Sequence, residues 1–280
     1  MKDGALTDEP DPARFGIPTL HCRVESWECD FNGHWNARFY ARSFRLAFES
    51  LPWLPGVTGS PRDRPDTRIL RFHRELFVGT PVEVRSARVA SGPYAGAVAH
   101  LLHAGGRLSA SSLDLGTGAV EGLPDAPAEM LSLIEPRSLD AEGTWTDGSA
   151  TSVCETGPIR PEELDPYGAL LPEEVFRRAG FATHNHVGAL GLDERYLAET
   201  GISRMSVETR VTAMEAPPAG TPLRARARIS RRATKSFAVA LLLETHAGRP
   251  AAFVEHYLVT VDLNTRRAVE LPEFLRAPED

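Results

Sequence analysis

One short polar segment carries the clearest chemical pattern of the chain. Asp30, Asn32 and His34 stand at alternate positions across a glycine turn, directly before a segment with helical spacing. Backbone N–H groups at a helix start lack intrahelical partners and favour negative charge, so they can stabilise an oxyanion. A carboxylate, an imidazole and a carboxamide beside such donors are what the hydrolysis of an acyl derivative needs. Helix capping would explain an Asp or Asn at this place, but it does not explain His34 followed by Trp35.

The flanking segments predict the elements that position this pattern. Residues 17–29 have strand character, and residues 36–51 place apolar side chains at helical spacing until Pro52 ends the pattern. Four extended segments follow, at residues 67–78, 81–90, 95–103 and 107–115. A helix followed by four antiparallel strands must bury its apolar side on one face of their sheet. We therefore expect an α+β unit in which a curved sheet wraps a long helix.

The same plan recurs later in the chain. Four short matches occur in the same order: D-F-N-G from Asp30 with D-P-Y-G from Asp165, G-T-P from Gly79 with G-T-P from Gly220, H-A-G from His103 with H-A-G from His246, and D-L from Asp114 with D-L from Asp262. Four ordered matches indicate two copies of one fold, with the helix of the second copy at about 171–189. A second copy can cover the open sheet edge of the first, so the sequence predicts a pseudo-dimer.

These boundaries give a predicted domain plan. We expect a disordered tail over residues 1–14, a first copy over 15–135, a polar linker over 136–152 and a second copy over 153–280.

The motif resembles that of the hot-dog-fold thioesterases, in which an Asp turn precedes Gly-His-x-Asn and an aromatic residue. Here the chain reads D-F-N-G-H-W-N followed by A-R-F-Y, starting at Asp30. Within that superfamily it is similar to the plant-type acyl-ACP thioesterases, which are double hot-dogs with D-x-N-x-H, and to 4-hydroxybenzoyl-CoA-type thioesterases. In the plant-type enzymes a Glu follows on the next strand, and F-H-R-E ending at Glu75 stands in that place. The resemblance implies a tandem double hot-dog and the catalytic set Asp30, Asn32, His34 and Glu75.

The chain departs from the plant-type pattern in the position of the motif. The plant-type enzymes carry it in the second hot-dog, whereas here it belongs to the first. The second copy has Ala169 and Leu171 where the first has His34 and Asn36. We therefore expect a degenerate second site, in which Asp165 serves the turn, and one active site per chain.

The reaction implied by the resemblance is hydrolysis of an acyl-CoA or acyl-ACP thioester to a free acid and a thiol. The carbonyl would lie over the helix start, with Gly33, Trp35 and Asn36 as substrate and oxyanion contacts. Water would be activated by Glu75 and His34. Asp30 would position the cluster and Asn32 would orient the water or the imidazole. Direct attack by a carboxylate, through an anhydride, stays open.

Two other functions remain open. Hot-dog hydratases and dehydratases resemble D-x-N-P-aliphatic-H, with Asp and His five residues apart. In this chain the spacing is four and the Pro is absent, which favours hydrolysis. A non-catalytic module that binds acyl groups or a carrier protein is the second alternative, because a fold does not fix a function.

Composition excludes several other classes of protein. The 280 residues carry 31 Lys and Arg against 38 Asp and Glu, a net charge of −7, which argues against a nucleic-acid partner. The apolar runs are shorter than the roughly 20 residues of a membrane helix, and the start has no apolar signal core. Three cysteines without C-x-x-C spacing predict no zinc site. We expect a cytoplasmic enzyme without cofactor or metal, a pseudo-dimer within one chain that could form a homodimer.

A pair of histidines and a row of arginines are two further candidate sites. His184 and His186 stand two apart on the second predicted helix and so face different sides, which favours a polar helix end over a metal site. Arginines at alternate strand positions could meet phosphates of coenzyme A, although a solvated sheet face is the commoner arrangement. These arginines are Arg224, Arg226 and Arg228.

Overall fold

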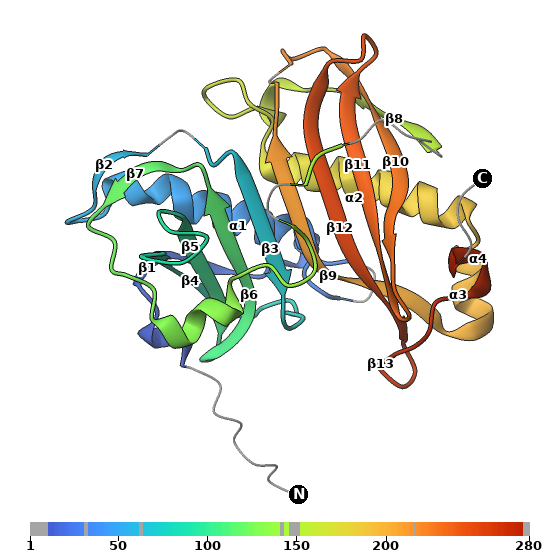
Figure 1. Ribbon diagram of the computed structural model, residues 1–280, viewed down its shortest axis with the longest axis horizontal. Coiled ribbons are helices and arrows are strands. Elements are labelled where there is room, and N and C mark those ends of the chain that lie inside the picture. Colours follow the sequence, from blue (N-terminus) through green and yellow to red (C-terminus); the bar gives the residue numbers. More distant parts are fainter. Residues whose placement is uncertain are drawn as a thin grey trace, which may run out of the picture. The chain divides into compact units, whose positions relative to one another are not determined.

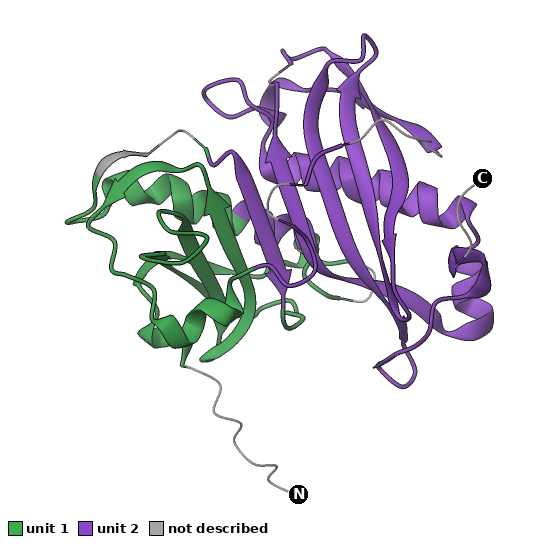
Figure 2. Ribbon diagram, viewed as in Figure 1, with its two compact units in different colours: residues 1–36, 43–64, 73–135 green, residues 37–42, 65–72, 136–280 purple. Residues whose placement is uncertain are grey.

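The computed structural model describes residues 11–30, 33–61, 64–140, 143–145, 152–215 and 217–276. The chain divides into two compact units (Figure 2). Unit 1 comprises Met1–Asn36, Ser43–Arg64 and His73–Glu135, and unit 2 comprises Ala37–Arg42, Pro65–Phe72 and Pro136–Asp280. The border after Glu135 coincides with the expected end of the first copy, whereas residues 37–42 and 65–72 group with unit 2. The division into two hot-dog domains at 15–135 and 153–280 stays a prediction.

Unit 1 contains an antiparallel sheet and most of helix α1 (Ala37–Ser50) (Figure 1). Its strands run in the order β1 (Ile17–Arg23), β4 (Pro81–Arg88), β5 (Val98–Ala104) and β6 (Arg107–Leu115), and β2 (Thr58–Pro61) pairs separately with β7 (Gly118–Glu121). Phe44 and Phe48 of α1 pack on His100 of β5. Met130, from the 3-10 helix η4 (Ala128–Leu133), belongs to a core cluster with Phe15, Leu101 and other buried residues. The sheet therefore buries side chains on both of its faces.

Unit 2 contains a larger antiparallel sheet that wraps helix α2 (Pro172–Ala189) (Figure 1). The strand order is β3 (Thr67–Phe72), β9 (Ile202–Ala213), β12 (Pro250–Asp262), β11 (Ser236–Thr245), β10 (Pro222–Arg232) and β8 (Ser152–Pro158). Every residue of β11 is buried, as expected for a strand covered on both faces. Three short elements complete the unit: α3 (Glu194–Thr200), β13 (Arg267–Ala268) and α4 (Glu273–Arg276). The α+β double hot-dog expected from the sequence is confirmed.

The boundaries of three elements differ from the predicted ones. The strand predicted over 17–29 ends at Arg23 and is followed by the 3-10 helix η2 (Ser26–Glu28). The strand predicted over 67–78 ends at Phe72, so Glu75 lies on a connecting segment. The tail expected over 1–14 is shorter, because Pro12–Arg14 form the 3-10 helix η1, and residues 1–10 lie outside the described residues. Within the described part of the chain, no helix is long and apolar enough to cross a membrane.

Candidate active site

A tight turn, the His34 turn (residues 28–36), leads from η2 into helix α1. The N–H of Asp30 donates to the carbonyl of His34 at 2.8 Å, and the N–H of Gly33 donates to the carbonyl of Asp30 at 3.0 Å. The carboxylate of Asp30 closes the turn by accepting the His34 N–H at 3.0 Å. Gly33 has a φ of +76°, a conformation that glycine adopts without steric cost. The turn thereby fixes the backbone of His34 three residues before α1 begins.

The imidazole of His34 meets the carboxylate of Glu75. Nδ1 of His34 lies 3.3 Å from Oε1 of Glu75, and the two side chains are 19% and 25% exposed. The two segments are aligned by a bridge between His34 and Phe77 and by the Trp35 N–H, which donates to the carbonyl of Leu76 at 2.7 Å. Phe77 also packs its ring edge-to-face with the imidazole, at 5.0 Å between centroids. His34 and Glu75 are therefore brought together as predicted, on two segments that hydrogen bonds hold in register.

A buried carboxylate is hydrogen-bonded to this turn. Glu28, at the end of η2, is only 2% exposed, and its Oε2 accepts the indole N–H of Trp35 at 2.8 Å. The carbonyl of Glu28 accepts the N–H of Asn36 at 2.9 Å. Glu28 is not among the site residues predicted from the sequence. The only signal was its place six residues before His34, on a segment predicted as strand.

The backbone amides of the turn are already engaged. The N–H groups of Gly33, His34, Trp35 and Asn36 donate to Asp30 O, Asp30 Oδ1, Leu76 O and Glu28 O. This corrects the expectation that amides near residues 34–36 polarise a carbonyl, because each donor already has an acceptor in the protein. The indole of Trp35 is likewise bonded to Glu28.

Asn32, Asp30 and Cys29 complete the candidate segment before α1. Asn32 lies outside the described residues. The carboxylate of Asp30 serves the backbone of the turn, in keeping with the positioning role expected for it. Burial, with the charges of Asp30 and Glu28, raises the pKa of the Cys29 thiol, which disfavours the thiolate that a cysteine nucleophile requires.

The second copy contains the same turn without the imidazole. In this Ala169 turn (residues 163–171), the Asp165 N–H donates to the Ala169 carbonyl at 2.8 Å, and the Gly168 N–H donates to the Asp165 carbonyl at 3.0 Å. Oδ1 of Asp165 accepts the Ala169 N–H at 2.8 Å. Asp165 is thus the turn residue that the sequence predicted.

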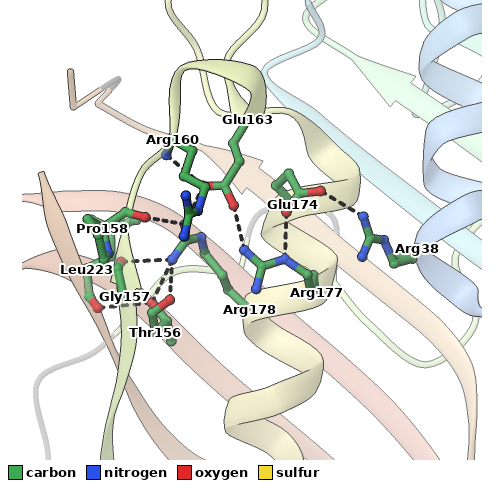
Figure 3. A network of polar contacts seen from close by, with 10 residues as sticks. All are labelled: Arg38, Thr156, Gly157, Pro158, Arg160, Glu163, Glu174, Arg177, Arg178 and Leu223. Atoms are coloured by element: carbon green, nitrogen blue, oxygen red, sulfur yellow. Dashed lines mark hydrogen bonds and ion pairs between the residues drawn. The ribbon is translucent and has the colours of Figure 1, made fainter. Parts of the chain in front are cut away.

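The buried acid of the Ala169 turn has a different partner (Figure 3). Glu163, at the end of the 3-10 helix η5 (Pro161–Glu163), accepts from the guanidinium of Arg178 at 2.5 Å and from Arg177 at 2.7 Å. Arg178 is 1% exposed and also donates to the carbonyls of residues 156–158. Burial alone would raise the pKa of Glu163, but the Arg160 N–H and the Arg178 and Arg177 guanidinium groups hold it below its usual value. This network belongs to stability, because it holds α2 against β8.

A second group of chemically interesting residues is fully buried in unit 1. Ser86 Oγ lies 2.6 Å from Nδ1 of His100, and Nε2 of His100 lies 3.4 Å from the carboxylate of Asp114. All three are 0% exposed. Ser112 and Thr19 extend the chain of polar contacts at its two ends. The order Ser–His–Asp resembles a hydrolase triad, but its complete burial under α1 makes it a structural network of the sheet.

The two histidines of α2 and the alternating arginines of β10 lie in separate environments. Nδ1 of His186 contacts Ser152, and Nδ1 of His184 contacts Arg204, so the two imidazoles face different elements. Among the described residues no group of His, Cys, Asp or Glu is arranged to hold a metal ion. The three alternating arginines of β10 singled out from the sequence are partly covered: Arg224 pairs with Glu244 at 2.7 Å, and Arg226 and Arg228 stack on Trp145.

Comparison with known sequences gives a family match for part of the chain. Residues 159–278 match a family model described as "Thioesterase-like superfamily". No curated protein matches the chain in sequence.

Solved structures match over most of the chain. A putative oleoyl thioesterase from Lactobacillus plantarum has a TM-score of 0.59 at 13% identity, covering 89% of this chain and 98% of its own. A 12:0-ACP thioesterase from Umbellularia californica has a TM-score of 0.55 at 12% identity, with coverages of 86% and 93%. An acyl-ACP thioesterase from Bacteroides thetaiotaomicron has a TM-score of 0.52 at 11% identity, with coverages of 85% and 96%.

The family model covers the copy without the His34 motif, and the structural matches extend over both copies. The resemblance stated from the sequence is therefore confirmed for the fold: the chain has a double hot-dog fold similar to that of solved thioesterases, and its residues 159–278 match the thioesterase-like family model.

Proposed function

We propose that this protein is an acyl thioesterase that hydrolyses acyl-CoA or acyl-ACP thioesters at the His34 turn. The observation that carries the proposal is the contact of 3.3 Å between Nδ1 of His34 and Oε1 of Glu75, on a turn that hydrogen bonds fix directly before α1. The second copy keeps the turn and has Ala169 in place of the histidine. The match to the thioesterase-like family model and the activities named for the structural neighbours support thioester hydrolysis as the reaction.

The geometry supports a general-base mechanism. Because Nδ1 of His34 faces Glu75, Nε2 is the nitrogen that can accept a proton from water. The water oxygen attacks the thioester carbon and forms a tetrahedral oxyanion. The intermediate then expels the thiolate, which takes the proton from the imidazolium to leave a thiol and a carboxylic acid. Glu75 orients the ring and stabilises its charged form, while Asp30 holds the backbone beneath it.

The choice of carrier rests on charge. Acyl carrier proteins are the substrates named for two of the structural neighbours. This chain has a net charge of −7, which offers no general attraction for an acidic carrier protein. Acyl-CoA thioesters are therefore the first substrates to test. Homodimer formation and a cytoplasmic location remain proposals beside it.

The deciding experiment is a thiol-release screen over acyl-CoAs from acetyl to palmitoyl, including aryl and hydroxylated acyl groups, with acyl-ACPs in parallel. We expect hydrolysis of at least one substrate. His34→Ala should lower kcat/KM by about 10²–10⁴, because it removes the proposed base. The matched control is His21→Ala, since His21 is an exposed histidine of the same unit.

The same screen separates the alternatives. Loss of the enone absorbance of a trans-2-enoyl-CoA without free thiol would identify a hydratase instead. Thermal stabilisation by acyl-CoA without any thiol release would identify a binding module.

A further inference from the structure

Arg204 has an unusual environment on the helix-facing side of the unit 2 sheet. It lies on β9, and its Nη2 donates to Nδ1 of His184 on α2 at 2.7 Å. No carboxylate of the described residues lies within ion-pair distance of this guanidinium. Arg178 and Arg210, which are more deeply buried in unit 2, each have one: Arg178 pairs with Glu163 at 2.5 Å, and Arg210 pairs with Glu255 at 3.0 Å. Arg204 is therefore a partly buried cation whose protein partner is a neutral ring.

The contact with Arg204 sets the protonation of His184. A guanidinium only donates hydrogen bonds, so Nδ1 of His184 is the acceptor and Nε2 carries the proton. Burial and the charge of Arg204 lower the pKa of His184, which keeps the ring neutral. Burial also lowers the pKa of Arg204 to about 10, against the opposing charge of Glu194. Arg204 thus stays charged at neutral pH, and the His184 ring offers one further N–H donor beside it.

Polar groups without partners lie near this pair. Thr260 of β12 is the cross-strand neighbour of Arg204 and is fully buried, and among the described residues its Oγ1 has no hydrogen-bond partner. His256 lies on the same face of β12, since it is an even number of residues away. Its Nδ1 contacts Thr209 at 2.9 Å, while Nε2 is buried without a partner in the described structure. Each such unpaired group costs roughly 1–3 kcal/mol, which a ligand that pairs with it would recover.

The cluster also has a route to solvent. His184 is exposed and Arg204 is half-buried, while Thr260 and His256 lie behind them. Phe181, one helical turn before His184 on α2, has 53% of its surface exposed. An incoming anionic group could therefore reach Arg204, and an apolar tail attached to it would meet Phe181.

We propose that Arg204, His184 and Thr260 form a binding site for a small oxyanion, a carboxylate or a phosphate group. The guanidinium supplies the charge and the paired N–H donors that suit both groups, and the imidazole N–H and the Thr260 hydroxyl supply further donors. His256 closes the buried end as a neutral ring. This site is separate in its residues from the His34–Glu75 pair and does not depend on the function proposed for that pair.

Isothermal titration calorimetry at constant ionic strength tests the proposal with three probes: inorganic phosphate, acetate and octanoate. We expect at least one to bind. Arg204→Gln should weaken that binding at least about tenfold, because it removes a charged hydrogen-bond partner. Arg267→Gln is the matched control, since Arg267 is an exposed arginine of β13 in the same unit. Tightest binding of phosphate would assign a phosphate-bearing ligand, and octanoate above acetate would assign a carboxylate with an apolar tail.

Thr260→Val gives a second, independent readout. Removal of an unpartnered buried hydroxyl should raise the melting temperature of the ligand-free protein and at the same time weaken the binding of the probe. His34→Ala should leave binding of the probe unchanged, which separates this site from the proposed active site. The proposal is overturned if none of the three probes binds, or if Arg204→Gln binds them as the wild type does.

Discussion

The His34 turn and the Ala169 turn share one backbone and differ in the side chains placed on it. In both, an Asp carboxylate accepts the N–H of the residue four positions later, and a buried Glu at the end of a 3-10 helix precedes it. The segment just before each turn is hydrogen-bonded to a G-T-P turn in the same way. The Gly79 N–H donates to Val24 O, and the Gly220 N–H donates to Ile159 O, each at 2.8 Å. The two Asp residues are therefore required by the shape of the turn.

The two turns differ in the side chain that the Asp holds and in the partner of the buried Glu. In the first, the residue held by the Asp is His34, which meets Glu75, and the buried Glu28 holds an indole. In the second, the corresponding residue is Ala169, and the buried Glu163 holds the guanidinium of Arg178. We therefore propose that functional importance lies with His34, which Ala169 replaces in the second copy, and with its partner Glu75, rather than with the Asp that both copies keep.

Glu75→Gln gives the largest expected effect on this contrast. A neutral amide cannot stabilise the imidazolium of His34, so kcat/KM should fall by about 10²–10³, mainly through kcat. Ala169→His is the control in the other turn and should leave kcat/KM unchanged. Near wild-type kcat/KM in Glu75→Gln would contradict the proposed role.

Glu163→Gln probes the scaffold side of the comparison. It leaves the Arg178 guanidinium buried without its charge partner, which should destabilise the protein by about 3–5 kcal/mol. Glu28→Gln keeps an oxygen for the indole N–H of Trp35 and should cost only about 1 kcal/mol. Denaturant midpoints of the two variants measure the difference. Equal losses would show that the two buried acids carry the same structural weight.

A buried histidine of unit 2 predicts that the fold is sensitive to acid. Nδ1 of His256 contacts Thr209 at 2.9 Å, with the imidazole of His184 and the guanidinium of Arg204 nearby. Burial and those two groups lower the pKa of His256 from 6.5 to about 4. Stability from the neutral ring is thus present above pH 6.5 and is lost as the pH falls towards 4, by about 3 kcal/mol.

His256→Gln checks this pH dependence, because glutamine does not titrate. The fall in the free energy of unfolding between pH 6.5 and 4 should be smaller in the variant than in the wild type. Glu163, whose pKa is lowered, contributes in a different window, since its stabilisation is lost only as the pH falls below about 4.5. An unchanged pH slope in His256→Gln would assign the acid sensitivity to other groups.

The sequence predicted those parts of the site that depend on local pattern. Apolar periodicity placed α1 and α2 to within one residue of each end, and residue types identified His34. The resemblance supplied Glu75, but the strand predicted around it ends at Phe72, because the chain turns away to form the bridge with His34.

The rest depends on contacts between distant segments. Amide donors at residues 35 and 36 were expected to be available, but their acceptors are Leu76 O and Glu28 O, which pairing of separate segments brings near. The sequence does not indicate a role for Glu28, because acidic side chains are rarely buried. Its burial is possible because the indole N–H of Trp35 donates to its carboxylate. Arg204 carried no sequence signal, since the absence of a carboxylate partner appears only in three dimensions.

Asp30→Ala and Asp165→Ala give the smallest expected effect and the sharpest test of shared scaffold. Each removes one carboxylate that accepts the backbone N–H four residues later, so each should cost about 1 kcal/mol of stability. Only Asp30→Ala should also lower kcat/KM, because only there does the turn carry an imidazole that must meet Glu75 within 3.3 Å. Denaturant midpoints and thiol release, measured on both variants, separate the two effects. A different result would contradict this role: Asp30→Ala and Asp30→Asn both lose activity as completely as His34→Ala, and Asp30→Asn keeps the wild-type denaturant midpoint. Asp30 would then act on the substrate itself, and the two aspartates would not be equivalent.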